Sequence, residues 1–422
     1  MSSFRFIHTG DIHLDSALRG LSGHEGPAVD RIRTATRTAF ANLVTQAIEE
    51  QVAFMVIAGD LYDGDWKDFR TGLFFVAQMG RLRTAGIPVY VLYGNHDAES
   101  QITKRLELPD NVHVFGGRKA ETFKLDELRV AFHGQSFRLQ ATTENLAEKY
   151  PKPVAGYFNI GVLHTALGGS VGPHENYAPC TLAELVSKGY DYWALAHVHQ
   201  GGVLHKNPHV VFCGNLQGRH IREIGAKSAQ LVSVQDGMVH DTEPVHTDVV
   251  RWMHVEVPVA GCIRFGDVID GIRKQLGEAA GTAEGRMLAC RIHLKGQTEL
   301  HGELLASGEQ LLAEARAAAL ALGEEAAWVL NVVNTTMPAA RASSAVEATA
   351  LNDLNVLMAE ACTDSELLAQ VQDELGELMR KLPHEVTLDL EDPLLQAAAD
   401  KDFSAVVGQA SAYLTARLGT GR

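Results

Sequence analysis

Residues of the types that bind metal ions follow several apolar runs in the first 200 residues of the chain. Carboxylate, amide and imidazole groups suit a divalent ion of borderline hardness such as Mn²⁺, Fe²⁺ or Zn²⁺. The absence of cysteine from the set argues against a structural zinc site. Two such ions about 3.5–4 Å apart form a clamp for phosphoryl transfer, which one carboxylate can bridge. The groups occur in five motifs: Asp11-x-His13, Gly59-Asp60, Gly94-Asn95-His96-Asp97, His164 and His197-x-His199.

Alternating strands and helices are expected to bring these motifs together. The runs 4–8, 52–58 and 88–93 indicate strands, and helical spacing of apolar residues predicts helices over 27–50 and 70–83 between them. This β-α-β-α-β order predicts an α/β sheet with helices on both faces. Because ligands bind at the carboxyl ends of strands in such sheets, the motifs should converge on one edge. Later strands are expected at 112–115, 129–133, 158–163, 191–195, 209–213 and 228–234.

The pattern changes near residue 250. A strand at 252–257, a helix at 265–278, strands near 287–294 and 327–333 and an Ala-rich helix at 303–322 indicate a small α+β domain. Residues 335–344, with Pro338, are expected to form a linker, and the chain beyond it is expected to be helical to about 418, with a break at Pro383. We therefore predict a first domain over 1–250, a second over 251–338 and a helical tail over 345–422.

Composition and charge exclude several classes of protein. The 422 residues are 46% hydrophobic and carry a formal net charge of −15, which does not fit a basic nucleic-acid coat. Residues 343–422 hold 14 acidic and 5 basic residues, so much of the acidity lies in the tail. Five scattered cysteines and the lack of an apolar run of about 20 residues argue against a disulfide framework and a membrane span. We expect a cytoplasmic protein.

Taken in order, the five motifs resemble those of the calcineurin-like metallophosphoesterases. The stretches His8–Asp15 and Gly214–His220 are most similar to the SbcD/YhaO type, the nuclease subunit that works with a coiled-coil ATPase. The resemblance covers about residues 1–250 and is weak beyond them. It implies a two-sheet metallophosphoesterase sandwich flanked by helices, with a capping domain and a partner-binding tail. Ala196 stands where that pattern usually has glycine, and we expect a slight backbone adjustment with metal binding retained.

The same resemblance implies a role for each motif residue. His96 would protonate the leaving oxygen as a general acid, and Asp97 would orient His96 and raise its pKa. Asp60 would bridge two divalent ions, most simply Mn²⁺. One ion would be held by Asp11, His13 and His199, and the other by Asn95, His164 and His197.

Four further residues have open roles near the predicted site. Arg219 and His220 follow a strand end, where they would contact a substrate phosphate or form a structural salt bridge. Asp15 and Asp63 would orient metal ligands or simply stabilise turns.

The resemblance predicts a Mn²⁺-dependent DNA exonuclease or endonuclease acting at DNA ends in double-strand-break repair. Its partners would be DNA and an SMC-like coiled-coil ATPase of the SbcC/YhaN type, and proteins of this type commonly form homodimers. The apolar faces of the acidic tail would either dock the ATPase or pack on the chain's own domains. Two alternatives stay open. One is a phosphoesterase for a cyclic nucleotide or a phosphomonoester, which the acidic charge favours. The other is a non-catalytic regulator of the ATPase.

Overall fold

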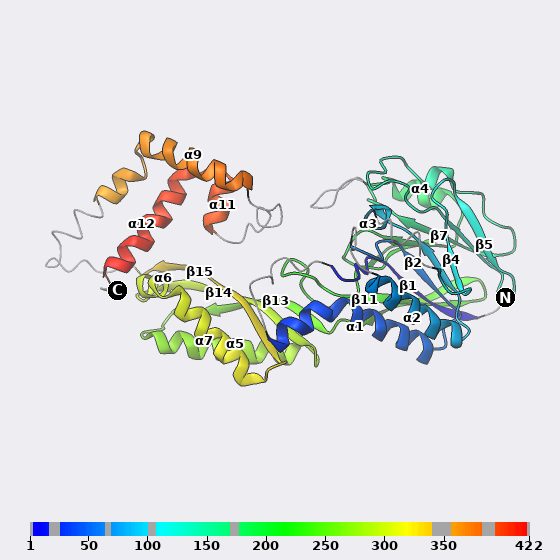
Figure 1. Ribbon diagram of the computed structural model, residues 1–422, viewed down its shortest axis with the longest axis horizontal. Coiled ribbons are helices and arrows are strands. Elements are labelled where there is room, and N and C mark those ends of the chain that lie inside the picture. The colour runs from blue at the N-terminus through cyan, green and yellow to red at the C-terminus, as the bar shows by residue number, and fades with distance from the viewer. Residues whose placement is uncertain are drawn as a thin grey trace. The chain divides into compact units, whose positions relative to one another are not determined.

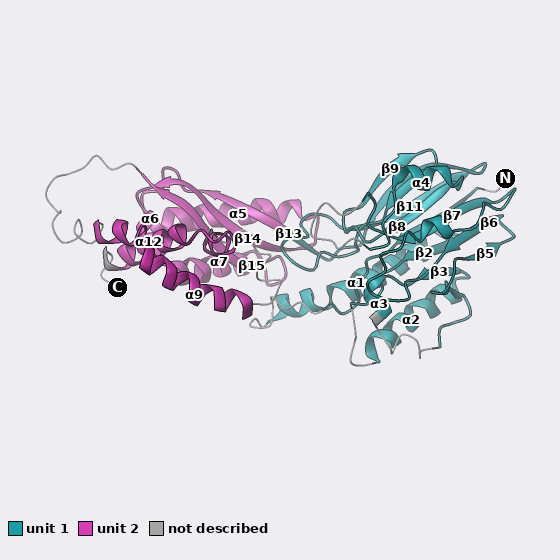
Figure 2. Ribbon diagram, turned by 90° about the horizontal axis from the view of Figure 1, so that it is seen from above, with its two compact units in different colours: residues 1–252 teal, residues 253–422 magenta. Residues whose placement is uncertain are grey.

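A computed structural model describes residues 3–16, 26–63, 69–99, 107–168, 177–339, 356–381 and 393–419. The chain divides into two compact units, Met1–Trp252 and Met253–Arg422 (Figures 1 and 2). None of the described helices is long and apolar enough to cross a bilayer.

The first unit is built on two six-stranded sheets. The first sheet has the order β12 (Met238–His246), β11 (Ser228–Gln235), β1 (Phe4–Thr9), β2 (Phe54–Ala58), β3 (Val89–Leu92) and β4 (Val112–Val114). The second has the order β5 (Glu121–Leu125), β6 (Val130–Gly134), β7 (Phe158–His164), β8 (Tyr192–Ala196), β10 (His209–Phe212) and β9 (Gly202–Lys206). In each sheet the four strands that carry or flank the motifs are parallel. These are β1, β2, β3 and β4 in the first sheet and β6, β7, β8 and β10 in the second.

The layers of this unit confirm the two-sheet sandwich and correct one detail of the pattern-based prediction. Helices α1 (Pro27–Glu49) and α2 (Arg70–Thr84) both pack on the outer face of the first sheet, where Phe40 and Phe75 stack. The other face is covered by the second sheet rather than by helices. Phe54 lies between the sheets, 4.8 Å from the ring centroids of both Phe6 and Phe132. Burying one such side chain contributes about 1.5–3 kcal/mol. Because every residue of β2 is buried on both faces, it reads as a continuous apolar run.

The outer face of the second sheet is covered by α4 (Leu182–Ser187) and a short 3-10 helix, Ala147–Lys149. A capping box between Thr181 and Glu184 begins α4. The indole of Trp193 donates a hydrogen bond to the Leu185 carbonyl at 3.0 Å, which fixes the helix on the strand β8 that leads to the His197 motif.

The second unit contains a three-stranded sheet of β13 (Val250–Pro258), β14 (Met287–Thr298) and β15 (Ala327–Pro338). Its helices are α5 (Phe265–Thr282), α6 (His301–Ala306) and α7 (Gly308–Leu322), followed by α9 (Ser365–Lys381), α11 (Pro393–Ala399) and α12 (Phe403–Gly419). The expected Ala-rich helix is therefore two helices, and β15 runs through the first residues of the expected linker. Pro383 lies outside the described residues. Helix α12 packs against α6, where Gly302 faces Ala416.

Candidate functional site

Tight turns at the strand ends bring the predicted motifs together. Asp11 and His13 follow β1, Asp60 follows β2, and α3 (Asn95–Glu99) begins directly after β3. The backbone is left-handed at Asp11, His13 and Asp60, with φ near 50° at each, and Asp11 N–H donates to the Gly59 carbonyl at 3.0 Å. These turns lie side by side because β1, β2 and β3 are adjacent and parallel. The second sheet adds His164 at the end of β7 and His197 and His199 after β8.

One group of ligand atoms comes from Asp11, His13 and His199, whose donor atoms all lie within 4.8 Å of one another. The Nε2 atoms of His13 and His199 face each other at 3.2 Å. The Nδ1–H of His199 donates to the Glu223 carboxylate at 2.6 Å, and His13 Nδ1 faces Asp63 at 3.3 Å. Since the Nδ1 atoms are engaged, both Nε2 lone pairs are directed at one point, an arrangement that a shared cation stabilises.

A second group comes from Asp60, His164 and His197, again within 4.8 Å. His164 Nδ1–H donates to the Ala58 carbonyl at 3.1 Å, so its Nε2 is turned to the Asn95 amide oxygen at 3.0 Å. His197 N–H donates to the Asp11 carboxylate at 2.9 Å, which joins the two groups. The structure thus brings all seven predicted ligands to one edge of the sandwich.

Asp60 lies between the two groups. Its Oδ2 is 3.4 Å from His164 Nε2 and 3.8 Å from His13 Nε2, and its Oδ1 accepts a hydrogen bond from the His96 N–H at 3.1 Å. Although burial raises it, the surrounding imidazoles hold the pKa of Asp60 well below its usual range. Burial lowers the pKa of His164, but the Asp60 carboxylate raises it more strongly, and the net result is a rise to about 9. An ionised carboxylate between two sets of nitrogen ligands is what a bridging position requires.

His96 extends to the rim of the site. Its side chain is 37% exposed, and its Nδ1 lies 3.3 Å from Asp63 Oδ1. Donor atoms of His96, His13 and Asp60 form a further group within 4.8 Å. Asp63 contacts both rings, and Ser16 donates a hydrogen bond to it at 2.6 Å. Burial raises the pKa of Asp63, but His13 and Arg219 outweigh burial and keep it below its usual value.

Asp97 does not take the position predicted beside the His96 ring. Its carboxylate accepts hydrogen bonds from the N–H groups of Tyr62 at 2.8 Å, Gly94 at 2.9 Å and Leu61 at 3.1 Å. Neighbouring residues of a helix point in different directions, so His96 and Asp97, both in α3, diverge. Burial and the Asp60 charge raise the pKa of Asp97 to about 7. Asp97 thus joins the turn after β2 to the turn after β3, and Asp63 is the carboxylate beside His96.

Gly59 shows how tightly the second group is packed. Its φ is +105°, and a Cβ atom there would lie 2.6 Å from His164 Nδ1, the atom that donates to Ala58. Only glycine meets both demands without strain. The Gly-Asp motif therefore reflects the geometry of the site as well as its ligand chemistry.

Asp15 and Arg219, two further residues predicted near the site, form ion pairs within the protein. Asp15 pairs with Arg37 and accepts a hydrogen bond from Thr71, so it stabilises the turn and the helices. Arg219 is buried, 3.1 Å from Glu223 and 3.7 Å from Asp63. These contacts favour the structural salt bridge for Arg219.

His220 and Glu223 both lie in the segment after β10, but of these two described residues only Glu223 forms a hydrogen bond with a candidate ligand. His220 is 42% exposed, with its Nε2 3.8 Å from Glu223, and burial lowers its pKa to about 4. Glu223 itself was not predicted. Its signal in the sequence is weak, because a single glutamate eight residues after Asn215 shows no pattern until the loop folds back on His199.

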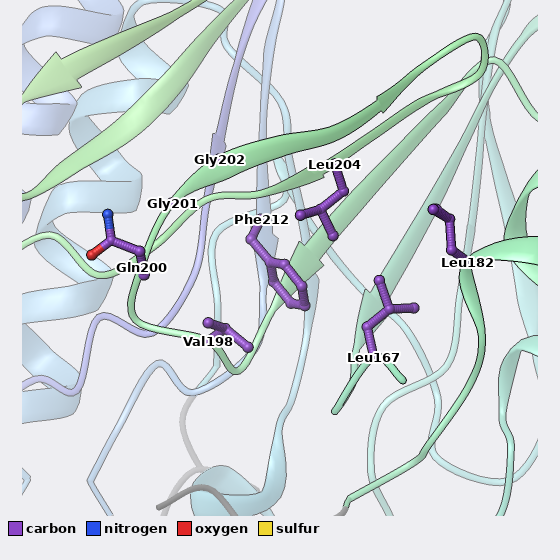
Figure 3. Close-up of a pocket in the computed structure, with 8 residues that line it drawn as sticks. All are labelled: Leu167, Leu182, Val198, Gln200, Gly201, Gly202, Leu204 and Phe212. Atoms are coloured by element: carbon purple, nitrogen blue, oxygen red, sulfur yellow. The ribbon is translucent and has the colours of Figure 1, made fainter. Parts of the chain in front are cut away.

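An apolar cavity lies next to the His197 motif on the outer side of the second sheet. It has a volume of about 550 Å³ and is lined by Leu167, Leu182, Val198, Leu204 and Phe212, with Gln200 at its margin (Figure 3). Val198 separates His197 from His199 in the sequence. Because this lining offers few polar groups, the cavity is not suited to a phosphate.

Comparison with known proteins agrees with this geometry. Residues 4–201 match the calcineurin-like phosphoesterase family, and residues 252–337 match the middle domain of the metallophosphoesterase YhaO. The "Uncharacterized metallophosphoesterase YhaO" of Bacillus subtilis (strain 168) is 39% identical over 264 residues, which are 61% of this chain and 64% of that protein.

More distant relatives are proteins named "DNA double-strand break repair protein Mre11". Those of Methanopyrus kandleri and Sulfurisphaera tokodaii are 28% and 29% identical, over 46% and 47% of this chain and 44% and 50% of theirs. The matches thus span between about half and two thirds of the length of these relatives. The resemblance predicted from the motifs is confirmed at the level of domains: residues 4–201 form a calcineurin-like phosphoesterase domain, and residues 252–337 form a middle domain of the YhaO type.

Proposed function

We propose that this protein is a Mn²⁺-dependent nuclease that hydrolyses phosphodiesters at DNA ends during double-strand-break repair. The observation that carries the proposal is the pair of ligand groups on either side of Asp60, the arrangement of a two-metal phosphoesterase. DNA as the substrate is supported by the repair relatives, whose similarity lies in the part of the chain that contains the site.

The chain supplies orientation and charge for this reaction. Two divalent cations, when bound, would polarise the phosphate and lower the pKa of an attacking water molecule. Asp11, His13 and His199 would hold one of them, Asn95, His164 and His197 the other, and Asp60 both. The carbonyl of Ala58 and the carboxylates of Glu223 and Asp63 fix which imidazole nitrogen faces the site.

His96 is placed to act on the leaving group. Its Nδ1 lies 3.3 Å from Asp63 Oδ1, so Asp63 orients the ring and Nε2 is left outside that contact. A protonated imidazole at the rim stabilises negative charge on the phosphate and donates its proton to the leaving oxygen. In this proposal Asp63, rather than Asp97, orients the acid.

Hydrolysis of linear duplex DNA in the presence of Mn²⁺ tests the proposal. We expect release of nucleotides or short fragments that stops when EDTA is added and is absent from the Asp60→Ala variant. A cyclic nucleotide and a phosphomonoester run in parallel test the small-substrate alternative. The nuclease proposal would be contradicted if the protein hydrolysed those two compounds but left DNA uncut, both by itself and in the presence of a coiled-coil ATPase.

We also propose that the tail binds a coiled-coil ATPase. Helix α9 has no buried residue, and it carries Leu367, Val371, Leu375 and Leu378 at helical spacing. The first three are half-buried where α9 contacts α11 and α12, whereas Leu378 is 52% exposed and open to a partner. Its acidic surface disfavours DNA as the occupant. Leu378→Asp should abolish co-purification with the ATPase while Glu377→Asp, the neighbouring exposed position, should not. Equal co-purification of the two variants would contradict this role.

A further inference from the structure

A second cavity opens beside His199, and its lining shares Gln200, Gly201 and Gly202 with that of the apolar cavity. It has a volume of about 320 Å³ and lies where β9 and β10 of the second sheet approach β11 and β12 of the first. Its lining includes His199, Gly214, Asn215, Lys227, Thr242 and His246. One member of the group formed by Asp11, His13 and His199 therefore belongs to the wall of this cavity.

Lys227 is the unusual residue of this cavity. It is only 6% exposed, and among the described residues no hydrogen bond or ion pair holds its ammonium group. Burial lowers its pKa, against the pull of the Glu223 and Asp248 carboxylates. Lysine is rarely buried without a partner, because an uncompensated charge costs several kcal/mol of stability.

The neighbouring charges do not neutralise Lys227, because each has a closer partner. Asp248 forms an ion pair with Arg251 at 3.0 Å. Glu223 accepts hydrogen bonds from His199 at 2.6 Å and from Arg219 at 3.1 Å. Lys227 is thus left as an excess positive charge at the wall of a cavity that begins at a candidate metal ligand.

We propose that this cavity binds a phosphate group of the substrate next to the scissile phosphate, and that Lys227 is its counter-ion. The inference rests on the proposed nuclease function and sharpens it: the preferred substrate would be a polynucleotide strand with at least two phosphates, rather than a cyclic nucleotide or a phosphomonoester. The Thr242 hydroxyl is buried without a hydrogen-bond partner among the described residues, and it lines the same cavity farther along β12, where it can donate to a second group of the bound strand. A phosphate there would give the unpaired ammonium group a counter-charge.

Selectivity between substrates of one and two phosphates tests this site. The measured quantity is the ratio of kcat/KM for a ten-residue oligothymidylate to kcat/KM for bis(p-nitrophenyl) phosphate, which has a single phosphate. Lys227→Met should lower this ratio about tenfold. Lys227→Arg, which keeps the charge, should restore at least part of the selectivity. Lys206→Met, at the exposed end of β9, is the matched control and should behave as wild type. Equal selectivity in wild type and Lys227→Met would overturn the inference.

A binding measurement separates this inference from the nuclease proposal. In EDTA, Lys227→Met should bind the fluorescent oligothymidylate about tenfold more weakly than wild type, and the slope of log affinity against log salt should fall by about 0.7. If wild type binds in this way but never cuts, the nuclease proposal fails and the phosphate site stands. If wild type cuts and the two proteins bind alike, the phosphate site fails alone. Thermal unfolding of each variant verifies folding, and Lys227→Met should unfold at or above the wild-type temperature in low salt.

Discussion

The two halves of the candidate metal centre are supported differently by the surrounding protein. In the half formed by Asp11, His13 and His199, both imidazoles are backed by carboxylates, Asp63 and Glu223. In the half formed by Asn95, His164 and His197, the backing of His164 is a neutral backbone carbonyl. The first half also has a carboxylate ligand of its own, whereas the second has an amide.

This contrast has consequences for metal affinity. Carboxylate backing increases the basicity of an imidazole ligand, and negative ligands attract a cation more strongly than neutral ones. Both halves are buried, and the side chain of His199, 14% exposed, is the most accessible of the six. We therefore expect the first half to bind its ion more tightly. Metal affinity in the first half should depend on the charges of Asp63 and Glu223, whereas affinity in the second should depend on how its side chains pack.

Replacing the carboxylate common to both halves should have the largest effect. Asp60→Ala removes an oxygen ligand from each ion and leaves His13 and His164 without their shared counter-charge. We expect no calorimetric Mn²⁺ binding at micromolar concentrations and no hydrolysis. Retention of one tight ion would show that Asp60 belongs to a single half.

Replacing the rim histidine should separate chemistry from binding. His96→Ala should keep both ions, with calorimetric affinities within about threefold of wild type, and should lose about 10²- to 10⁴-fold in kcat. The corresponding Asp97→Asn variant should mainly lower thermal stability, because its carboxylate accepts three backbone N–H groups. Loss of an ion from His96→Ala would instead identify His96 as a ligand.

Removing one backing charge should affect one half alone. Glu223→Gln keeps the shape of the side chain but replaces the carboxylate that accepts the His199 Nδ1–H. We expect the affinity of the tighter ion to fall about 10- to 100-fold, with the weaker ion nearly unchanged. Glu148→Gln, at an exposed position, is the control. Equal weakening of both ions would mean that the halves do not differ as their contacts indicate.

The seven candidate ligands could be predicted from the sequence because each lies at or just after the end of a buried parallel strand. Strands such as β2 and β7 are buried along their whole length, so they appear as unbroken apolar runs, and their ends must meet at one edge. The edge strands β5, β9 and β12 were missed because they contain only exposed and half-buried residues and therefore no such run.

The residues that support the ligands were harder to predict because their roles depend on contacts between distant segments. Asp63 reaches His96 across 33 positions, and Glu223 reaches His199 across 24. Asp97 was misplaced for a local reason, since the Gly-Asn-His-Asp motif begins a helix and its last two side chains diverge. Motif order thus predicts the ligands, whereas the carboxylates behind them require the folded chain.

The smallest effect is expected at Ala196, where the chain departs from the family pattern. Its methyl group is buried in the core between the two sheets, and a Cβ at Gly10 would lie 2.6 Å from it, so Gly10 and Ala196 share the space of one methyl group. Ala196→Gly should change Mn²⁺ affinity less than twofold and destabilise the fold by about 0.5–1 kcal/mol, measured by urea unfolding. Gly10→Ala alone should weaken both ions, because it pushes β1 from β8 next to Asp11 and His197. The double variant should recover much of that loss, since it moves the methyl group rather than adding one; no recovery would mean that the alanine does not compensate for the glycine across the sheets.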